Sequence, residues 1–504
     1  MVHRCSDLGL SRLLLLAAVV LGACTSQPKQ TTNQNFYDKY LFFDMDTEVE
    51  KVACPIQGEI PAWLSGTLLR NGPAKFQVGD KRVGWFDGLA MLHAFDFSPD
   101  QVLYTNRFIR SEQYYIMMDG KSLNFGGFAQ DPCPQVFKNQ TSKFIPQDAK
   151  NIKNAGVTIQ EYADQMVALT ETPLPVVFDV DTLNTLGNFQ FQDQLPQGQW
   201  MSAHSQNDMA AGETVSYYVH FGQKSSYVIW TMADHSSTRQ LLAEIPVDLP
   251  AYIHSFALTE HYAILVEFPF VVNPLDLMAH KQPFIYNYKW MPQNGTNFYV
   301  VDRSSGNVTK IKGDPFFSFH HVNAFDEKGK IYIDIVTYAN ADTIALITGR
   351  LKDKSDIEKA NKTTFERFTI SMTDQTLSRQ TLFDKTTEMP RVPADRTAYK
   401  YRYAYAVDNT FPTSNNDARA LYKVDTINKS GTSWAEAGCF PGEPIFVTNP
   451  NGQGEDDGVV LSLILDYANH HSFLLVLDAK NMTELARAAV PNPVPVGLHG
   501  LWKP

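Results

Sequence analysis

Four histidines of this chain stand far apart, in settings that suit a shared metal ion. Imidazole nitrogen binds several transition metals, so these residues are the first candidates for chemistry. They are separated along the chain by 50, 66 and 179 residues. Such spacing excludes a local helical motif such as HExxH and favours separate elements that each deliver one ligand to a common axis. The candidate ligands are His204, His254, His320 and His499.

The elements that must position these histidines are short runs rich in β-branched and aromatic residues, separated by turn formers. Clear examples cover residues 330–336, 458–465 and 472–478, and the turn-rich stretch 449–458 leads directly into the second of them. Amphipathic helical patterns are scarce, and residues 354–361 form one short candidate. Many short strands in one long chain favour an all-β propeller or a large barrel, although no blade-length repeat stands out.

The composition agrees with a large β-rich domain. The 504 residues are 44% hydrophobic and include 32 Phe and 22 Tyr beside many Gly and Pro, which favours strands joined by tight turns. The net charge is −11 and no basic patch is visible, so no nucleic-acid partner is expected. Three further cysteines could form at most one disulfide; they are Cys54, Cys133 and Cys439. Because none of them forms a CxxC pair for zinc, a bound metal must be held by histidine.

Residues 1–23 are typical of a secretory signal of the lipoprotein type. Two arginines precede the apolar run 13–21, and small residues stand directly before Cys24, as at a cleavage site. The residues around Cys24 resemble the bacterial lipobox, with an ordinary signal peptide or an uncleaved anchor as the alternatives. We therefore expect an exported bacterial lipoprotein, anchored to a membrane on its periplasmic or outer-membrane face. A lipid-anchored polar tether at 24–36 would precede one folded domain at 37–504.

Several ordered blocks resemble the signatures of one known family. The settings of the four histidines, in this order, are similar to the metal-histidine motifs of the carotenoid cleavage oxygenases. This family includes the β-carotene oxygenases and the retinal pigment epithelium isomerohydrolase. Blocks at 66–73, 85–93, 400–405 and 443–447 resemble its other signatures. The resemblance covers residues 37–504, and several ordered blocks make it specific.

The resemblance implies a seven-bladed β-propeller with a loop and helical cap over one axial Fe(II) per chain. The four candidate histidines correspond to the iron ligands, with His321 as the adjacent rival of His320, while His93 is not a ligand in the family pattern. Three glutamates correspond to carboxylates that accept N–H bonds from ligand imidazoles, orient the rings and supply negative charge. They are Glu171, Glu388 and Glu443. No catalytic residue is expected beyond the metal centre.

The resemblance also implies the reaction, the oxidative cleavage by O2 of a C=C bond in a carotenoid or apocarotenoid to aldehydes such as retinal. Thr170 stands where bacterial stilbene-cleaving relatives typically carry a lysine, which counts against a phenolic stilbene. Retinyl-ester processing and a non-catalytic carotenoid-binding propeller remain as alternatives.

Membrane contact beyond the lipid on Cys24 depends on one apolar segment. The stretch 268–278 is unusually apolar for a segment that contains proline, and the resemblance places a membrane-facing patch near it. The block 124–133 resembles one found in the animal-type members. For both segments, the alternative is a buried loop.

Overall fold

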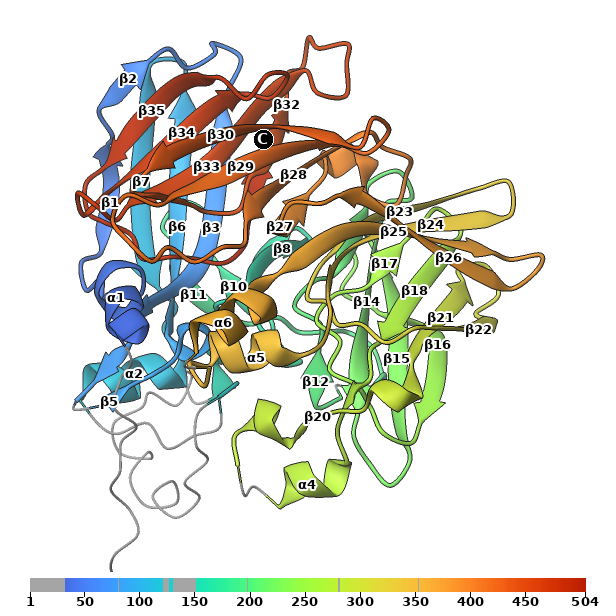
Figure 1. Ribbon diagram of the computed structural model, residues 1–504. Coiled ribbons are helices and arrows are strands. Elements are labelled where there is room, and N and C mark those ends of the chain that lie inside the picture. Colours follow the sequence, from blue (N-terminus) through green and yellow to red (C-terminus); the bar gives the residue numbers. More distant parts are fainter. Residues whose placement is uncertain are drawn as a thin grey trace, which may run out of the picture.

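The computed structural model of this chain describes residues 32–79, 81–120, 127–129, 151–196, 198–279, 282–351 and 353–504. Strands dominate these ranges and form seven sheets of four to six strands arranged about a central axis (Figure 1). The fold is a seven-bladed β-propeller, which confirms the predicted fold class. The predictions for residues 1–23, for Cys24 and for most of the block 124–133 lie outside the described residues.

The first four blades follow one another along the chain. Blade 1 contains β1 (Val49–Ala53), β3 (Gly66–Lys75), β6 (Leu89–Ser98), β7 (Gln101–Phe108) and β36 (Gly500–Lys503). Blade 2 contains β8 (Thr158–Tyr162), β9 (Gln165–Leu169), β10 (Val176–Phe178) and β11 (Thr185–Asn188). Blade 3 contains β12 (Trp200–Met201), β13 (Gln206–Asp208), β14 (Glu213–His220), β15 (Ser225–Ala233) and β16 (Gln240–Val247). Blade 4 contains β17 (Ala257–Leu258), β18 (Tyr262–Glu267), β21 (Thr296–Asp302) and β22 (Val308–Gly313).

The remaining blades include the three strands predicted most clearly, which correspond to β24, β33 and β34. Blade 5 contains β23 (His321–Glu327), β24 (Lys330–Tyr338), β25 (Thr363–Ser371) and β26 (Thr376–Phe383). Blade 6 contains β27 (Thr387–Arg391), β28 (Tyr403–Asp408), β29 (Ala418–Asp425) and β30 (Ser430–Ala437). Blade 7 contains β2 (Ile56–Gly58), β31 (Cys439–Pro441), β32 (Ile445–Thr448), β33 (Gly458–Asp466), β34 (His471–Asp478) and β35 (Glu484–Val490). Two small ribbons pair β4 (Gln77–Val78) with β5 (Lys81–Arg82) and β19 (Phe270–Val271) with β20 (Lys289–Trp290).

Burial changes from the middle of a blade to its outer edge. The central strands β24 and β33 are buried over most of their length, because neighbouring blades cover both faces of a sheet. The outermost strand β30 is exposed or half-buried throughout. The inner edge strands face the axis, so residues at their ends can meet residues from other blades.

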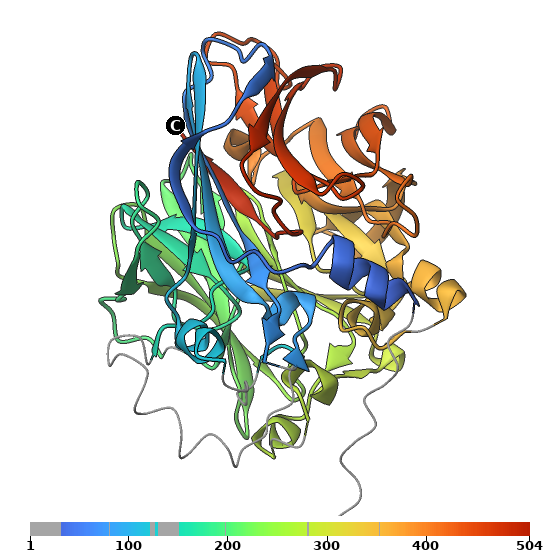
Figure 2. The same cartoon turned by 90° about the vertical axis from the view of Figure 1, so that its left-hand side faces the viewer.

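Strands from the two ends of the chain close the ring. β36, near the C-terminus, pairs with β3 in blade 1, and β2, near the N-terminus, pairs with β35 in blade 7. Figure 2 shows the blue N-terminal strands beside the red C-terminal strands. Each end of the chain thus completes a blade that the other end mostly forms, which also satisfies backbone groups that an open sheet edge would expose.

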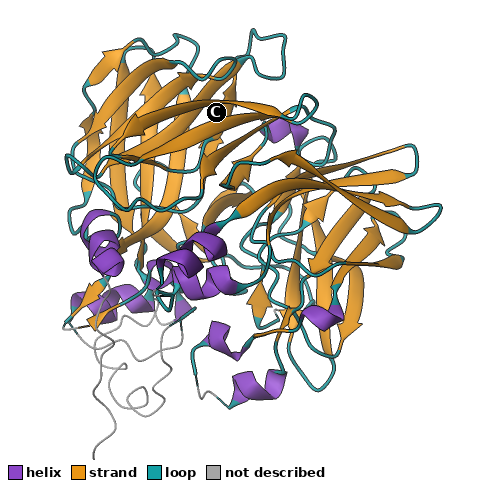
Figure 3. Cartoon of the chain, in the orientation of Figure 1, coloured by secondary structure: helices purple, strands orange, loops and turns teal. Residues whose placement is uncertain are grey.

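Most of the helices lie on one side of the strands and form a cap (Figure 3). The α-helices are α1 (Thr32–Tyr40), α2 (Glu112–Met118), α4 (Pro274–Met278), α5 (Asp342–Ile347) and α6 (Lys354–Asn361). Short 3-10 turns are η1 (Trp85–Asp87), η4 (Phe284–Asn287), η5 (Pro292–Asn294) and η6 (Ala394–Arg396). α6 coincides with the predicted helix at 354–361.

The folded domain begins before the expected boundary at residue 37. Residues 32–36, expected in the tether, belong to α1. The Phe36 ring packs against Tyr40 and Tyr467, with centroids 4.8 and 6.0 Å apart. Because burial of aromatic surface stabilises this contact, the helix docks on blade 7 and is not part of a free linker.

The apolar stretch 268–278 is buried for the most part. Phe268 and Phe270 are 1% and 6% exposed, whereas Leu275 on α4 is 68% exposed. No helix within the described ranges is long and apolar enough to cross a bilayer. The buried-loop alternative therefore holds for the β19 part of the stretch, and only α4 offers apolar surface to the outside.

The cysteines that the structure describes are isolated thiols. Cys54 and Cys439 are free and buried, so they do not form the disulfide that the sequence left open, and Cys133 lies outside the described ranges. Burial raises the pKa of Cys54 to about 11 and that of Cys439 to about 12. Both side chains are therefore protonated and serve as small apolar groups.

Candidate metal centre

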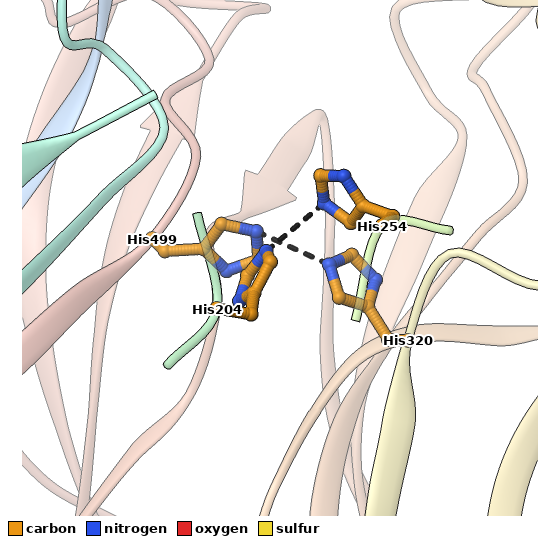
Figure 4. A group of neighbouring side chains, drawn as sticks. All are labelled: His204, His254, His320 and His499. Atoms are coloured by element: carbon orange, nitrogen blue, oxygen red, sulfur yellow. Dashed lines mark hydrogen bonds between the residues drawn. The ribbon is translucent and has the colours of Figure 1, made fainter. Parts of the chain in front are cut away.

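The four candidate histidines converge on the propeller axis, although they come from four different blades. His204 lies between β12 and β13, His254 shortly precedes β17, and His320 and His499 directly precede β23 and β36. Their rings point toward one another (Figure 4), and one ligand nitrogen from each ring lies within 4.8 Å of all the others. The structure therefore brings together all four residues that the sequence predicted as ligands.

The contacts between the rings fit a cation better than a hydrogen-bonded cluster. Nε2 of His204 and Nε2 of His254 are 2.9 Å apart, and Nε2 of His320 and Nε2 of His499 are 3.2 Å apart. Since Nδ1 of His320 and of His499 each faces a carboxylate, Nδ1 carries the proton in the neutral ring and both Nε2 atoms present lone pairs. Two facing lone pairs repel each other, and a shared metal ion converts them into ligands.

The three predicted glutamates lie behind three of these rings. Glu171 accepts from Nδ1 of His254 at 2.7 Å. Glu388 accepts from Nδ1 of His320 at 2.5 Å, and Glu443 from Nδ1 of His499 at 2.7 Å. Such bonds fix the tautomer and the orientation of each ring and raise its basicity as a ligand.

Burial keeps three of the four imidazoles neutral, as metal ligation requires. Loss of hydration lowers the pKa of His499 to about 4, although Glu443 acts in the opposite direction. Burial also lowers the pKa of His204 and of His254. These rings are therefore unprotonated at neutral pH and have lone pairs for a metal.

The two other histidines considered from the sequence have structural positions. His321, the rival of His320, is buried and its Nδ1 lies 2.9 Å from the Ser255 hydroxyl. His93 is buried in blade 1, with Nδ1 2.7 Å from the Tyr104 hydroxyl. Burial lowers the pKa of both to about 3. Neither residue belongs to the group of four, which agrees with the choice of His320 as the ligand.

A cavity of about 840 Å³ opens onto the metal site. His254, His320 and His499 form part of its wall, and much of the remaining wall is aromatic. The aromatic residues include Phe86, Phe128, Trp200, Tyr252, Phe284 and Phe319. The cap helices α2, α4, α5 and α6 each contribute lining residues, so the predicted cap does cover the axial site.

Sequence reasoning missed the partners that hold the carboxylates. The Tyr252 hydroxyl donates to Glu171 at 2.6 Å, and the Tyr338 hydroxyl donates to Glu388 at 2.8 Å. Tyr252 stands two residues before a ligand histidine, so strand alternation could have signalled that it lies on the same side. Tyr338 carries no such local signal, because it reaches Glu388 across 50 residues of sequence.

A further carboxylate, also missed from the sequence, fixes one wall of the cavity. Asp87 in η1 accepts the backbone N–H groups of Phe128 at 2.7 Å and Ala129 at 3.0 Å. The Phe128 ring packs against Phe86 and Tyr252, with centroids 5.3 and 5.9 Å apart. Burial raises the pKa of Asp87 to about 6, although the two N–H groups act to lower it. Asp87 therefore sets the position of an aromatic side chain that faces the cavity.

The fold and the site together define a class of metal-dependent enzyme, a β-propeller with an axial four-histidine site. Comparison with known proteins specifies the class. Residues 42–504 match the family model described as retinal pigment epithelial membrane protein. The chain therefore belongs to this family, that of the carotenoid cleavage oxygenases, and it is an enzyme of that family.

Individual relatives match this chain over nearly its whole length. Identity is 28% to the β,β-carotene 15,15'-dioxygenase of Rattus norvegicus, covering 91% of this chain and 90% of that protein. Identity is 30% to the mitochondrial carotenoid-cleaving dioxygenase of Macaca fascicularis, covering 90% of this chain and 92% of that protein. A mutant of the apocarotenoid oxygenase of Synechocystis matches with a TM-score of 0.80 at 28% identity, over 94% of this chain and all of that chain. A cobalt-substituted form of the Synechocystis protein matches with a TM-score of 0.77 at 27% identity, over 94% of this chain and 100% of that chain.

Proposed function

We propose that this enzyme is an iron(II)-dependent dioxygenase that cleaves one C=C bond of a carotenoid or apocarotenoid and releases aldehydes such as retinal. One Fe(II) per chain and O2 are the expected cofactor and co-substrate. The observation that carries the proposal is the four-histidine site at the wall of an aromatic cavity. Names of the relatives, a β,β-carotene dioxygenase and an apocarotenoid oxygenase, support the class of substrate.

The donor set fits ferrous iron. Imidazole is a good ligand for divalent iron, but four neutral rings bring no charge of their own. Glu171, Glu388 and Glu443 supply negative charge through the rings that they orient. When bound, iron supplies a redox-active centre at which O2 and an alkene react without an organic cofactor. A Synechocystis relative described as cobalt-substituted supports a site for a divalent transition metal.

The residues of the cavity have two tasks. The aromatic rings of Phe86, Phe128 and Phe319 provide flat apolar walls along which a conjugated polyene can lie, and they keep water away from the site. Phe319 also packs against His254, with ring centroids 5.5 Å apart. The wall that orients the substrate is therefore continuous with the side chains that hold the metal.

One residue of the cavity wall also helps to choose between a carotenoid and a hydroxylated stilbene as the substrate. Thr170 lines the cavity beside Glu171, and its short neutral side chain cannot act as the lysine that binds the phenol in stilbene-cleaving relatives. A carotenoid or apocarotenoid therefore fits this wall better than a hydroxylated stilbene.

Product analysis tests the proposal. Iron-loaded protein is incubated with β-carotene and with apocarotenals of several lengths under ¹⁸O2, and the products are identified by mass spectrometry. Aldehydes that contain the label support the proposal. His254→Ala should abolish turnover and iron retention, whereas His261→Gln, at an exposed histidine paired with Asp326, should keep both. Unlabelled retinol from a retinyl ester, or a bound carotenoid that is never cleaved, would contradict it.

We also propose that residues 1–23 are removed and that a lipid on Cys24 holds the exported enzyme at a bacterial membrane. The small residues before Cys24 support this proposal. Leu275 on the cap, 68% exposed, offers a second apolar contact of the kind that stable attachment needs. Mass spectrometry of membrane-extracted protein is the test, and a mature chain without an acyl group would contradict it.

A further inference from the structure

The three carboxylates behind the ligand histidines differ in the charge of their other partners. Glu171 accepts from the Tyr252 hydroxyl, and Glu388 accepts from the Tyr338 hydroxyl and from the backbone N–H of Met389. Within the described part of the chain, these two carboxylates thus receive only neutral donors besides histidine. The full negative charge of each carboxylate remains available to the metal site.

Glu443 receives two guanidinium groups. Nη1 of Arg70 donates to its Oε2 and Nε of Arg391 to its Oε1, both at 2.7 Å. Nδ1 of His499 uses the same Oε1 atom at 2.7 Å. Side-chain exposure is 5% for Arg70, 1% for Glu443 and 32% for Arg391. One carboxylate oxygen is thus all that separates a ligand histidine from a fixed positive charge.

These arginines change the sign of the charge at the site. Three carboxylates around a divalent ion with four neutral imidazoles leave one net negative charge, which would favour oxidation of the ion. Arg70 and Arg391 bring the total to one net positive charge. Because screening is weak among buried charges, such a charge acts on the ion over several ångströms.

We propose that Arg391, together with Arg70, is a positioning residue that keeps the bound iron in the ferrous state by neutralising Glu443. The inference rests on the proposed function, since it takes the bound metal to be iron. An added positive charge disfavours the ferric ion more than the ferrous ion, so the pair raises the reduction potential of the site. Glu171 and Glu388, with neutral partners, hold the charge that binds the metal.

The test compares a charge-removing with a charge-keeping variant at Arg391, the more exposed of the two arginines. Arg391→Gln should bind iron at the stoichiometry of the wild type but show a lower Fe(III)/Fe(II) midpoint potential. Its ferric fraction in air, read by electron paramagnetic resonance, should rise on the order of tenfold. Arg391→Lys keeps the charge and should restore both values. Arg402→Gln, at an exposed arginine paired with Asp425 of the same blade, should leave both values unchanged.

The outcomes separate this inference from the proposed function. A wild-type protein that never takes up iron contradicts the proposed function, whatever the arginine does. Equal potentials in the wild type and in Arg391→Gln, both loaded with iron, overturn the inference. So does an equal shift in the Gln and Lys variants, because the lost bond from Arg391 to the carbonyl of Gly500 would then explain it.

A second measurement covers the case in which Arg391→Gln folds poorly. Arg391→Ala leaves space at a partly exposed site, and millimolar ethylguanidinium should restore the potential of the iron-loaded protein towards the wild-type value. Ethylammonium at the same concentration should act less well, because it lacks the planar group that pairs with a carboxylate. No recovery with ethylguanidinium would overturn the inference.

Discussion

At the scale of the residue, the metal site depends on neutral rings and ionised carboxylates side by side. Burial acts to raise the pKa of Glu388, but the adjacent His320 lowers it overall. For Glu443, the charges of Arg391 and Arg70 and the hydrogen bond from His499 outweigh burial and hold the pKa well below its usual value. Glu388 and Glu443 therefore stay charged and accept the Nδ1 hydrogen, which leaves Nε2 of His320 and of His499 free for the metal.

Glu388→Gln should weaken metal binding. The amide keeps the shape of the side chain but loses its charge and presents an N–H group or a weaker acceptor to His320. We expect metal affinity to fall about 10- to 100-fold, measured by competition with a chelator. Glu267→Gln is the matched control, because Glu267 is also buried and accepts from Tyr227 and Asn297 but contacts no ligand. Equal affinity in Glu388→Gln and the wild type would contradict the role of Glu388.

Asp87→Asn should change the pH dependence of stability. Burial raises the pKa of Asp87 from 3.8 to about 6. Between about pH 4 and pH 6 the unfolded chain has lost this proton while the folded chain still holds it, so the group lowers the free energy of unfolding as pH rises. The variant lacks this slope and should gain stability relative to the wild type from pH 4 to pH 7 in urea titrations. Parallel profiles for the two proteins would show that Asp87 does not titrate in this way.

At the scale of the element, the outer hairpins of four blades share one turn device. An aspartate ends or follows the first strand of the hairpin and accepts backbone N–H groups two or three residues further on. These bonds replace backbone pairing in the turn and fix the register of the strand that follows. The aspartates are Asp179, Asp302, Asp425 and Asp478. They are a trace of a blade repeat that does not stand out in the sequence.

Asp302→Ala should destabilise the fold without affecting the metal. The Asp302 carboxylate accepts from the backbone and side chain of both Ser304 and Ser305, and the loss of these bonds should lower the free energy of unfolding by about 1 kcal/mol. Asp302→Asn keeps an acceptor and should lose less. Metal content should be unchanged in both, because the hairpin lies at the outer edge of blade 4. A loss of metal in the alanine variant would contradict this separation of fold and site.

At the scale of the whole molecule, the metal site and the ring closure share one segment. His499 directly precedes β36, which completes blade 1. Arg70 on β3 donates to the carbonyl of Leu498 beside it at 2.6 Å. A metal ion held by His204, His254, His320 and His499 therefore links blade 1 to blades 3, 4 and 5.

Removal of the metal should lower the apparent Tm. A ligand that binds only the folded chain stabilises it by about 2.7 kcal/mol at a free concentration of 100 times Kd. Calorimetry with and without a chelator measures the effect. His254→Ala is the control, and its Tm should not respond to the chelator. An unchanged Tm in the wild type would mean that the four blades do not depend on the ion for their association.

Much of the site could be predicted from the sequence because its residues stand in recognisable local settings. The choice between His320 and His321 shows the limit. Neighbouring residues at the start of a strand point to opposite sides, so one of the two had to face the axis. The strand pattern alone leaves this choice open, and the family resemblance favours His320. In the structure, His320 faces His499 across the axis, while His321 faces Ser255.

The sequence by itself determined the all-β class and the helix at 354–361, and its resemblance to one family predicted the four histidines and the three glutamates that meet at the axis. The tertiary structure alone decided that Tyr338 and Arg391 support the carboxylates, that Asp87 fixes Phe128, and that α1 packs on blade 7. Tyr338 is 50 positions from Glu388, Arg391 is 52 positions from Glu443, and Asp87 is 41 positions from Phe128. The contact of α1 with blade 7 joins residues near opposite ends of the chain. Local periodicity reports which side of a strand a residue occupies, but the partner across the axis depends on how seven blades close into one ring.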